Sequence, residues 1–478
     1  MEAVDLHQPP VEGGAPALLQ AAEAAKGAAR ARRDAPWLRW RVDALEERVE
    51  ILEEIIGALP AGALSERQRI AFASGLRREL LPEDVGAAAA GQPPLAGWRA
   101  PWDYRRAQRQ EAAALPGLQE QPALAIPSDL VLTSAAAAPR AGLAGFFEEA
   151  AAFLASNYVE DDDGLFRFSY QAAHLEWSLL GGGEGDLELI VALREAAEPR
   201  GLVAFAAAAP TRLWVGGATA PSSFIDFVCV HKAHRGRRLC PLLYDVLLRR
   251  LAARGIARVI KTTGSPLALP IASARYFHMP LAGERLLACS FSSSSVSAVL
   301  PPPEPELRDL APSDAASALA FLDRVAERHE LGFKFLSPAH LAHVLLPRAG
   351  LVHTLVRADE RSGAVTDLVS CYFVAATILG ECPLKGEPMT AAYMYFFGGT
   401  TMTTSALTRS IAAKARDLGA DVFNMLAISD LQGMLYDQGV RAELSIGPGD
   451  GALRYFAANV ALEDGGVPAE RLFLFPGV

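Results

Sequence analysis

The stretch from Asp226 to Arg250, DFVCVHKAHRGRRLCPLLYDVLLRR, decides the fold expected for this chain. Apolar residues from Phe224 to Val230 predict a buried strand, and the apolar spacing from Pro241 to Arg254 predicts an amphipathic helix. A glycine flanked by arginines separates the two elements, in the order Arg235, Gly236, Arg237 and Arg238. Acidic residues outnumber basic ones in the whole chain, 55 to 45, so this basic cluster needs a local explanation.

The cluster has the features of an anion site. Between residues 231 and 254 a single acid, Asp245, faces seven basic residues: Lys232, Arg235, Arg237, Arg238, Arg249, Arg250 and Arg254. Unpaired backbone N–H groups at a helix start attract anions, and a glycine lets a phosphate come close to the backbone. A solvated basic turn is the plain alternative. The combination of strand, glycine and helix favours a pyrophosphate site.

Composition limits the class of protein. With 478 residues, 51% of them hydrophobic, the chain can bury a large core and form two domains or two halves. Its formal net charge of -10 argues against a nucleic-acid partner that is bound by phosphate neutralisation. Five cysteines without a C-x-x-C pair predict no disulfide framework and no metal site. Neither a signal peptide nor a membrane span is expected, so we predict a cytoplasmic protein.

The chain divides by composition into three segments. Residues 1–100 are rich in Ala, Gly and Pro and include a short helical heptad segment from Leu38 to Ile56, which could pair with a partner or fold back on its own domain. A Ser- and Pro-rich stretch predicts a boundary near residue 300. A pattern of strand, helix, glycine and strand occurs on each side of it, at 224–261 and 391–426. We therefore predict an α/β (α+β) fold in which halves 101–300 and 301–478 are related by a pseudo-twofold duplication, with a mixed sheet flanked by helices.

The two repeated junctions differ in charge. The second carries Gly398, Gly399, Thr400 and Thr401 and has no cation nearby. We therefore expect only the first half to be built for an anion.

Several segments together resemble known acyltransferases. The sequence Arg-Gly-Arg-Arg-Leu-Cys after a strand resembles the coenzyme A pyrophosphate loop of GNAT acyltransferases. Four separated segments resemble the N-myristoyltransferase family in the correct order: Asn157–Tyr170, Phe227–Lys232, Arg275–His278 and Gly447–Tyr455. The resemblance covers roughly residues 145–478. It implies two GNAT-like halves, myristoyl-CoA as co-substrate and no metal.

The resemblance implies a donor site at the first junction. The backbone N–H groups of Phe227 and Val228 would hold the thioester carbonyl oxygen, as an oxyanion hole does. Trp102 matches the family's aromatic motif near the coenzyme only in part. The residues implied in coenzyme binding are Trp102, Val230, Arg235, Gly236, Arg237, Arg238, Leu239, Cys240 and Pro241.

The resemblance also implies an acceptor site for the amine of an N-terminal glycine. Its pocket residues would be Tyr158, Phe166, Phe168, Tyr170, Thr262, Gly264, Tyr276 and His278. The aromatic ones could equally be core residues. Four acids would favour lysine or arginine further along the peptide, unless they are solvated surface: Asp161, Asp162, Asp163 and Asp450.

The chain departs from the family pattern at two catalytic positions. The family uses its terminal carboxylate to take the amine proton, and here Val478 ends a tail that contains Pro-Gly. Asp226 stands where the family commonly has Asn. The resemblance places Asp226 and Thr262 in the acceptor pocket and makes both candidate catalytic residues. The Asp226 carboxylate could hold the ammonium too firmly, or it could itself accept the proton.

The resulting expectation is a monomeric enzyme that myristoylates N-terminal glycines, with the ribosome as a candidate partner of residues 1–100. Two alternatives stay open. One is an acyl-CoA transferase of different acyl specificity, and the other is an acyl-CoA and peptide-binding protein that has lost turnover.

Overall fold

The computed structural model describes residues 123–138, 142–158, 164–181, 184–198, 200–264, 270–460, 462 and 466–475. The chain divides into two compact units, residues 1–98 and 99–478, and every described residue lies in the second. The predicted heptad segment therefore lies outside the described residues. Within the described ranges, no helix has both the length and the apolar character that a bilayer span requires.

Two runs of elements follow one another along the chain. The first comprises β1 (Leu130–Ser134), α5 (Leu143–Asn157), β2 (Phe166–Ser169), α6 (Ala172–Leu179), β3 (Ile190–Glu195), β4 (Leu202–Val215), β5 (Ala218–Val230), α7 (Leu239–Ala252), β6 (Arg258–Thr263), β7 (Ala272–Pro280) and α8 (Gly283–Ala288). The second comprises β8 (Arg308–Asp309), α9 (Ala315–Ala326), β9 (Leu331–Lys334), α10 (Pro338–Leu345), β10 (Val352–Ala358), β11 (Val365–Ile378), β12 (Pro388–Gly399), α11 (Thr404–Asp417), β13 (Val422–Leu426), α12 (Ser429–Tyr436), α13 (Gln438–Glu443), β14 (Gly447–Ala458) and β15 (Leu472–Phe473).

The two runs repeat the same order of elements. From β1 to β7 and from β8 to β14, a strand and a helix alternate twice, three strands follow, and a helix leads to two more strands, between which the second run inserts α12 and α13. The predicted pattern of strand, helix, glycine and strand is confirmed as β5, α7 and β6 and again as β12, α11 and β13. Both helices are followed by a glycine in the left-handed region, Gly255 with φ 71° and Gly419 with φ 90°. Glycine reaches that conformation without the penalty that a Cβ imposes.

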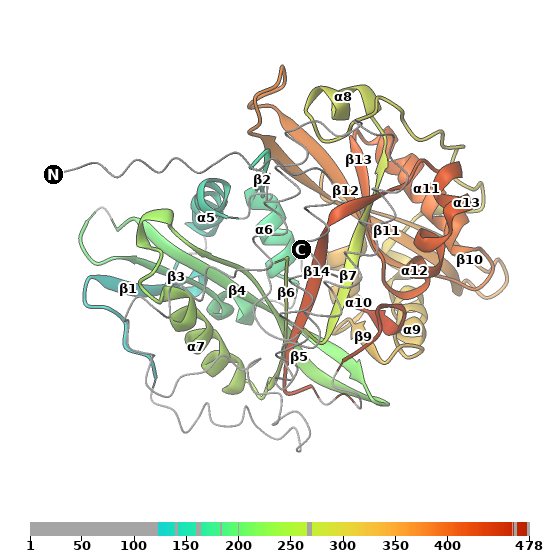
Figure 1. The fold of residues 1–478 in the computed structure, drawn as a ribbon. Coiled ribbons are helices and arrows are strands. Elements are labelled where there is room, and N and C mark those ends of the chain that lie inside the picture. The colour runs from blue at the N-terminus through green and yellow to red at the C-terminus, as the bar shows by residue number, and fades with distance from the viewer. Residues whose placement is uncertain are drawn as a thin grey trace, which may run out of the picture. The chain divides into compact units, whose positions relative to one another are not determined.

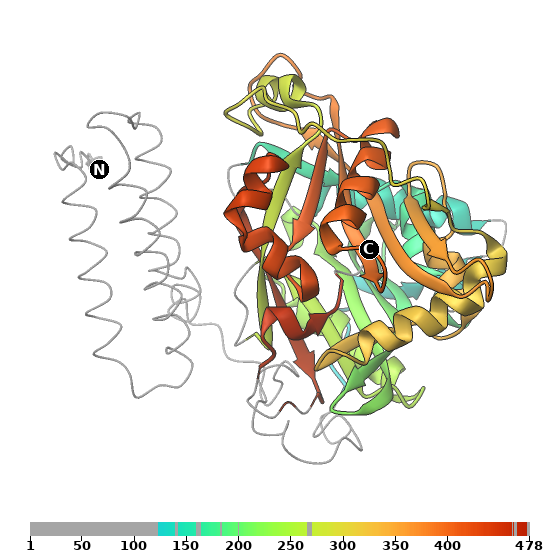
Figure 2. The same ribbon diagram turned by 90° about the vertical axis from the view of Figure 1, so that its right-hand side faces the viewer.

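The strands of the two runs interleave in one mixed sheet. Its order is β1-β3-β4-β5-β6-β14-β7-β13-β12-β11-β10-β8, which reads alike from either end when equivalent strands are exchanged. The seventh strand of each run is inserted beside the other run, because β14 pairs with β6 and β7 pairs with β13. The red β14 lies beside the yellow-green β7 in Figures 1 and 2. In the same way β2 pairs with β11 and β9 pairs with β4.

Helices cover both faces of the first half of the sheet (Figure 1). On one face, α5 and α6 enclose an apolar cluster in which Phe147 and Leu154 meet Phe205 and Phe227 of the strands. On the other face lies α7, whose Leu243 and Leu247 are fully buried. Burying a side chain of this size contributes about 1.5–3 kcal/mol, so these clusters fix the strand ends on which the site depends.

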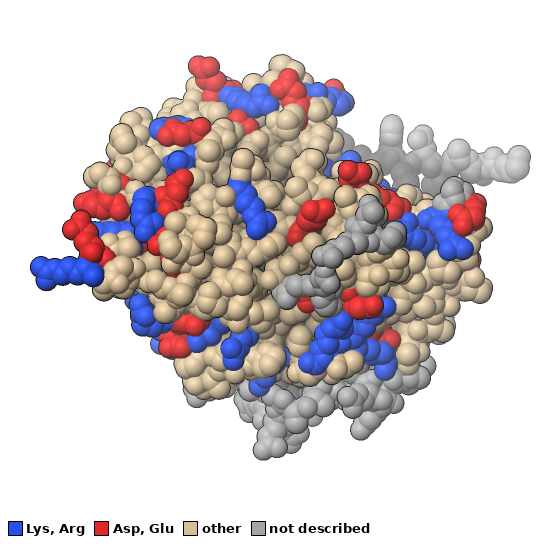
Figure 3. Space-filling model, turned by 180° about the vertical axis from the view of Figure 1, so that it is seen from behind, with Lys and Arg blue, Asp and Glu red and all other residues tan. Residues whose placement is uncertain are grey.

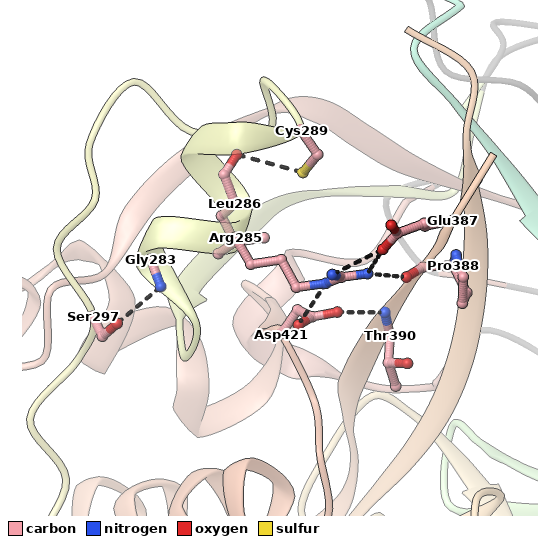
Figure 4. Close-up of polar contacts among 9 residues, drawn as sticks. All are labelled: Gly283, Arg285, Leu286, Cys289, Ser297, Glu387, Pro388, Thr390 and Asp421. Atoms are coloured by element: carbon pink, nitrogen blue, oxygen red, sulfur yellow. Dashed lines mark hydrogen bonds and ion pairs between the residues drawn. The ribbon is translucent and has the colours of Figure 1, made fainter. Parts of the chain in front are cut away.

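The short helix α8 is bound to the second half of the sheet (Figure 4). The Arg285 guanidinium forms ion pairs with Glu387 at 3.1 Å and Asp421 at 3.3 Å, and it donates to the Pro388 carbonyl at 2.7 Å. Asp421 in turn accepts from the Thr390 backbone N–H at 2.8 Å. This network fixes the segment that follows α8.

The described surface seen from behind carries acidic and basic side chains in close alternation (Figure 3). Neither sign dominates that face.

Candidate active site

The backbone of β5 is irregular where the oxyanion site was predicted. Phe205 of β4 pairs with Cys229 of β5, and Ala207 pairs with Asp226. Between these two pairs β5 advances by three residues and β4 by only two. The extra residue forms a bulge, in which the ladder of hydrogen bonds is locally broken. Phe227 stands in the left-handed region with φ 54°, a conformation that is strained for a residue with a Cβ.

Packing holds this strained residue in place. The Phe227 ring is 2% exposed and lies against the rings of Tyr170, at 5.0 Å, and Tyr158, at 6.0 Å. Burial raises the pKa of Tyr158, and a hydrogen bond from the Phe227 backbone N–H opposes that rise. The amide predicted to hold a carbonyl oxygen therefore already faces an oxygen atom.

The neighbouring strand leaves β5 at the same point. Among the described residues, β6 pairs with β5 only from Ser222↔Arg258 to Phe224↔Ile260. Beyond Phe224 the two parallel strands separate, and the bulge follows within three residues. Parallel strands that separate in this way expose backbone groups that a substrate can use.

The start of α7 has the backbone of an anion site. Gly236 has φ 83° and Arg238 has φ 58°, which turns the chain sharply before the helix. The side chain of the N-cap residue, Arg238, makes no capping hydrogen bond, and the first turn of the helix contains no acidic residue. Uncapped N–H groups at the start of a 14-residue helix favour a bound anion.

The arginine side chains of the loop do not all behave alike. Arg235 donates to the carbonyls of Asn157, at 2.8 Å, and Val230, at 3.4 Å, and so braces the loop. Arg237 forms two hydrogen bonds of 2.8 Å with the Asp129 carboxylate. The arginines at the far end of α7 pair with acids, Arg249 with Asp245 at 3.0 Å and Arg250 with Glu188 at 3.4 Å. The role of these loop residues in coenzyme binding stays a prediction.

The second junction corrects the expectation that only one half is built for an anion. Its backbone N–H groups do bind one, the protein's own Asp367 carboxylate. Thr400, Thr401 and Met402 donate to the same oxygen at 3.0, 3.0 and 2.9 Å. Asp367 is fully buried. We expected no anion at this junction because no cation lies nearby in the sequence. Backbone N–H groups alone, however, are enough to hold the Asp367 carboxylate there.

Aromatic residues predicted for the acceptor pocket form two groups. In the first, Tyr170 lies 6.0 Å from both Tyr158 and Phe168. In the second, His278 and Phe166 both contact Phe291, at 5.3 and 5.7 Å. Phe291 lies on the segment fixed by α8, and no local motif marked it in the sequence.

His278 is held from two sides. Its Nδ1 hydrogen-bonds with the Asn424 side-chain oxygen at 2.7 Å. On the other side, a Cβ added to Gly449 would lie 2.3 Å from His278 Nε2, so only glycine fits there. An irregularity of β14 between Pro448 and Ala452 brings this glycine-rich loop against the ring. The loop thereby orients the imidazole.

The remaining acceptor residues lie where the halves interleave. Thr262 of β6 pairs with Tyr455 of β14, and Tyr276 of β7 contacts Tyr393 at 6.3 Å. Gly264 ends the described part of this segment, and its carbonyl accepts a hydrogen bond from Arg454. Residues from both halves thus line one region.

Asp226 is the exceptional charge in this region. Burial raises its pKa to about 7, and the nearby Lys261 opposes the rise. The carboxylate lines a small cavity with Trp177 and Tyr395. Phe475, near the end of the chain, lines the same cavity. Sequence reasoning missed Lys261, Tyr395 and Asn424, although a lysine directly before Thr262 in a strand was a visible signal.

The chain end enters this region through well-anchored residues. The Leu474 carbonyl accepts from the Tyr455 hydroxyl at 2.8 Å, and the Phe475 ring lies 4.8 Å from that of Phe396. Five predicted residues lie outside the described residues: Trp102, Asp161, Asp162, Asp163 and Val478. For a sixth, Asp450, the structure describes the backbone and not the side chain. In the described part of the chain, no group of three or more His, Cys, Asp or Glu could hold a metal ion.

Comparisons with known proteins agree on one family. Sequence models of the N-terminal and C-terminal domains of myristoyl-CoA:protein N-myristoyltransferase match residues 144–274 and 299–472. The probable glycylpeptide N-tetradecanoyltransferase of Caenorhabditis elegans is 31% identical over 317 residues, which are 64% of this chain and 68% of the relative. Glycylpeptide N-tetradecanoyltransferase 1 of Arabidopsis thaliana is 29% identical, with 66% and 73% covered.

The fold agrees as well. The crystal structure of Saccharomyces cerevisiae N-myristoyltransferase with bound myristoyl-CoA is similar with a TM-score of 0.61 and 25% identity. The match covers 71% of this chain and 85% of that chain. The chain belongs to the myristoyl-CoA:protein N-myristoyltransferase family.

Proposed function

We propose that this protein transfers the myristoyl group of myristoyl-CoA to the amine of an N-terminal glycine. Its family membership supports the reaction. The observation that carries it is the bulge at Phe227, near the end of the strand whose following loop leads into the start of α7. Acyl transfer from a thioester needs donors for the carbonyl oxygen and a site for the coenzyme phosphates. The β5–α7 junction can supply both.

In this proposal the backbone N–H groups of Phe227 and Val228 bind the thioester carbonyl oxygen. The carbonyl replaces the Tyr158 hydroxyl at the Phe227 amide, and the phosphates lie at the start of α7 beside Arg238. Donors held at fixed positions stabilise the charge that develops on oxygen as the amine attacks.

The acceptor amine lies on the other side of the bulge, near Tyr170, Thr262 and Asp226. The peptide's ammonium must lose a proton before its nitrogen can attack the thioester. Phe475 and Asp226 line one cavity, so both the chain end and the Asp226 carboxylate are candidates for that proton. The proposed role of the Val478 carboxylate lies outside the described residues.

The proposal also covers the sequence preference for the peptide and the location of the protein in the cell. The acids at 161–163 and at 450 would favour basic residues downstream of the glycine. We further propose that the protein is a cytoplasmic monomer and acts on newly exposed N-termini. Residues 1–100 would hold it near the ribosome.

A transfer assay tests the proposal against its alternatives. The full chain is incubated with myristoyl-CoA, and in parallel with an acyl-CoA of another chain length, together with either a Gly-initiated peptide or the same peptide with an initial Ala. The products are identified by mass spectrometry. We expect acylation of the Gly peptide and release of coenzyme A. Binding of both substrates without coenzyme A release would favour the binding protein, and faster turnover of another acyl chain would favour a different acyl specificity.

A further inference from the structure

Tyr455 is a fully buried residue to which the reaction outlined above gives no role. It lies on β14, where its partners in the two neighbouring strands are Thr262 of β6 and Ala272 of β7. The Tyr455 carbonyl accepts from the Ile271 backbone N–H at 2.8 Å. The backbone of Tyr455 is therefore fixed between two strands of the first half, beside a residue predicted for the acceptor site.

The hydroxyl of Tyr455 binds the end of the chain. It donates to the Leu474 carbonyl at 2.8 Å, and both groups are buried. Burial raises the pKa of this hydroxyl well above its usual range, so it stays a protonated donor. A buried hydroxyl costs free energy unless it forms a hydrogen bond, and here the chain end supplies the acceptor. One side chain thus connects the strand beside Thr262 to the last described segment.

The residues on either side of Leu474 are held by other kinds of contact. Phe473 belongs to β15, which pairs with β9. The Phe475 ring packs against other aromatic rings and lines the same cavity as Asp226. Ring packing has little directional preference, whereas a hydrogen bond to a carbonyl is directional. The bond from Tyr455 therefore fixes the backbone just before the residue that reaches the cavity.

We propose that Tyr455 is a positioning residue for acyl transfer, whose hydroxyl fixes the backbone at Leu474 and so sets where the chain end enters the acceptor site. This inference rests on the proposed function, in which the chain end is one candidate for the ammonium proton. A proton passes only between groups within hydrogen-bond reach of each other. A small displacement of the chain end is therefore enough to slow the reaction.

The variant Tyr455→Phe tests this role, because it removes one hydroxyl and keeps the ring in the sheet. The single-turnover rate of acyl transfer should fall roughly 10- to 100-fold, since the chain end is no longer held in register. The affinities for myristoyl-CoA and for the Gly peptide, measured by titration calorimetry, should not change. Thr354→Val is the matched control, because the buried Thr354 hydroxyl also donates to a backbone carbonyl, that of Leu345 at 2.6 Å. It should leave the rate unchanged.

An extended tail separates positioning from a general loss of stability. One glycine added after Val478 displaces the terminal carboxylate and should slow acyl transfer in the wild-type background. In Tyr455→Phe the chain end is no longer fixed, so the same extension should slow the transfer by a smaller factor. In Thr354→Val it should slow the transfer by the wild-type factor. Equal factors in the wild type and in Tyr455→Phe overturn the proposal.

A second measurement needs no turnover. Hydrogen exchange of peptides that cover residues 472–475 is followed by mass spectrometry in the substrate-free protein. Exchange should be faster in Tyr455→Phe than in the wild type or in Thr354→Val, and unchanged exchange overturns the role of the hydroxyl. If Tyr455→Phe does not fold, 4-aminophenylalanine at this position, a weaker donor, should give intermediate values of rate and exchange, and wild-type values of both overturn the proposal.

The two measurements separate this inference from the proposed function. A wild-type chain that acylates no Gly peptide, while exchange at residues 472–475 responds to Tyr455→Phe, would count against the proposed function alone. Normal acyl transfer by Tyr455→Phe would count against the role of Tyr455 alone.

Discussion

The two strand–helix junctions of this protein repeat one order of elements and differ in the anion that they hold. At the β12–α11 junction the Asp367 carboxylate accepts three backbone N–H groups and the Thr366 hydroxyl at 2.8 Å. The hydroxyl of Thr401 donates as well. At the β5–α7 junction the first turn of the helix contains no acidic residue, and a glycine and arginines precede it.

The difference shows how a duplicated loop can serve two purposes. A carboxylate that accepts several N–H bonds is stable inside a protein. The second junction is therefore a closed junction, in which the protein's own Asp367 carboxylate occupies the N–H groups; we call the first the open junction. The N–H groups of the first junction are proposed to bind an external anion, and its carboxylate, Asp226, lies two residues beyond the last β5–β6 pair. One junction stabilises the fold, and the other is proposed to bind the donor.

Removing the internal anion should have the largest effect. Burial raises the pKa of Asp367, but hydrogen bonds from Thr401, Met402 and Thr366 outweigh it, and the net pKa is lowered. In Asp367→Ala three part-buried N–H groups lose their charged acceptor together, so the free energy of unfolding should fall by roughly 3–5 kcal/mol. Urea denaturation measures it. Because the pKa is lowered in the folded state, the stabilisation is present above about pH 4 and is lost as pH falls further.

A matched control for this change is Asp359→Ala. Asp359 also accepts backbone N–H groups, from Arg361 at 3.2 Å and Ser362 at 2.8 Å, but it lies in an exposed turn. Its loss should change stability far less. Equal denaturation midpoints for the two variants would show that the second junction does not need its carboxylate.

Reversing the charge of Arg238 at the β5–α7 junction should have the next largest effect, a loss of coenzyme A affinity. Arg238→Glu places a carboxylate where the donor phosphates are proposed to lie, and coenzyme A should bind about 30- to 100-fold more weakly. Peptide affinity should change little. Titration calorimetry with each ligand checks both. Arg254→Glu, two residues beyond the other end of α7, is the control, and an equal loss of coenzyme affinity there would contradict a phosphate site at the helix start.

The carboxylate at the open junction should reduce stability instead of raising it. The pKa of Asp226 is raised to about 7, so the protein favours its neutral form, and stability should be lost as pH rises through 7. Asp226→Asn removes this dependence. Relative to that variant, the wild type should lose about 2 kcal/mol of unfolding free energy between pH 5 and pH 7. Parallel pH dependences in the two proteins would mean that Asp226 is solvated.

Local signals in the sequence predicted one part of this comparison. The strand, helix and glycine signals of both junctions depend on neighbouring residues, so the elements β5, α7 and β6 and their counterparts β12, α11 and β13 could be predicted. The site motifs are local as well, so Phe227 and Gly236 could be named as candidate site residues, and their roles stay predictions. The left-handed conformation of Phe227 was not predictable, because tertiary packing and not its own preference imposes it.

The rest of the comparison depends on strands that pair in the sheet although they are far apart in the sequence. No local pattern indicates that β14 lies between β6 and β7, and this insertion brings Gly449 against His278. For the same reason Lys261 resembled an ordinary charge at a strand end, and Asp367 resembled a polar residue beside an apolar run. A buried charge is recognised only when its partners from distant segments are known.

The smallest expected effect concerns the internal partner of Arg237. Its ion pair with Asp129 joins side chains that are 34% and 60% exposed, so the pair is weak, but a donor phosphate would have to compete with it. Asp129→Ala should therefore tighten coenzyme A binding by less than about tenfold, and the gain should shrink at high salt, which screens exposed charges. Weaker binding in this variant would reverse the interpretation: Asp129 would then hold Arg237 in the orientation that the phosphates need, and the open junction would depend on an internal carboxylate as the closed one does.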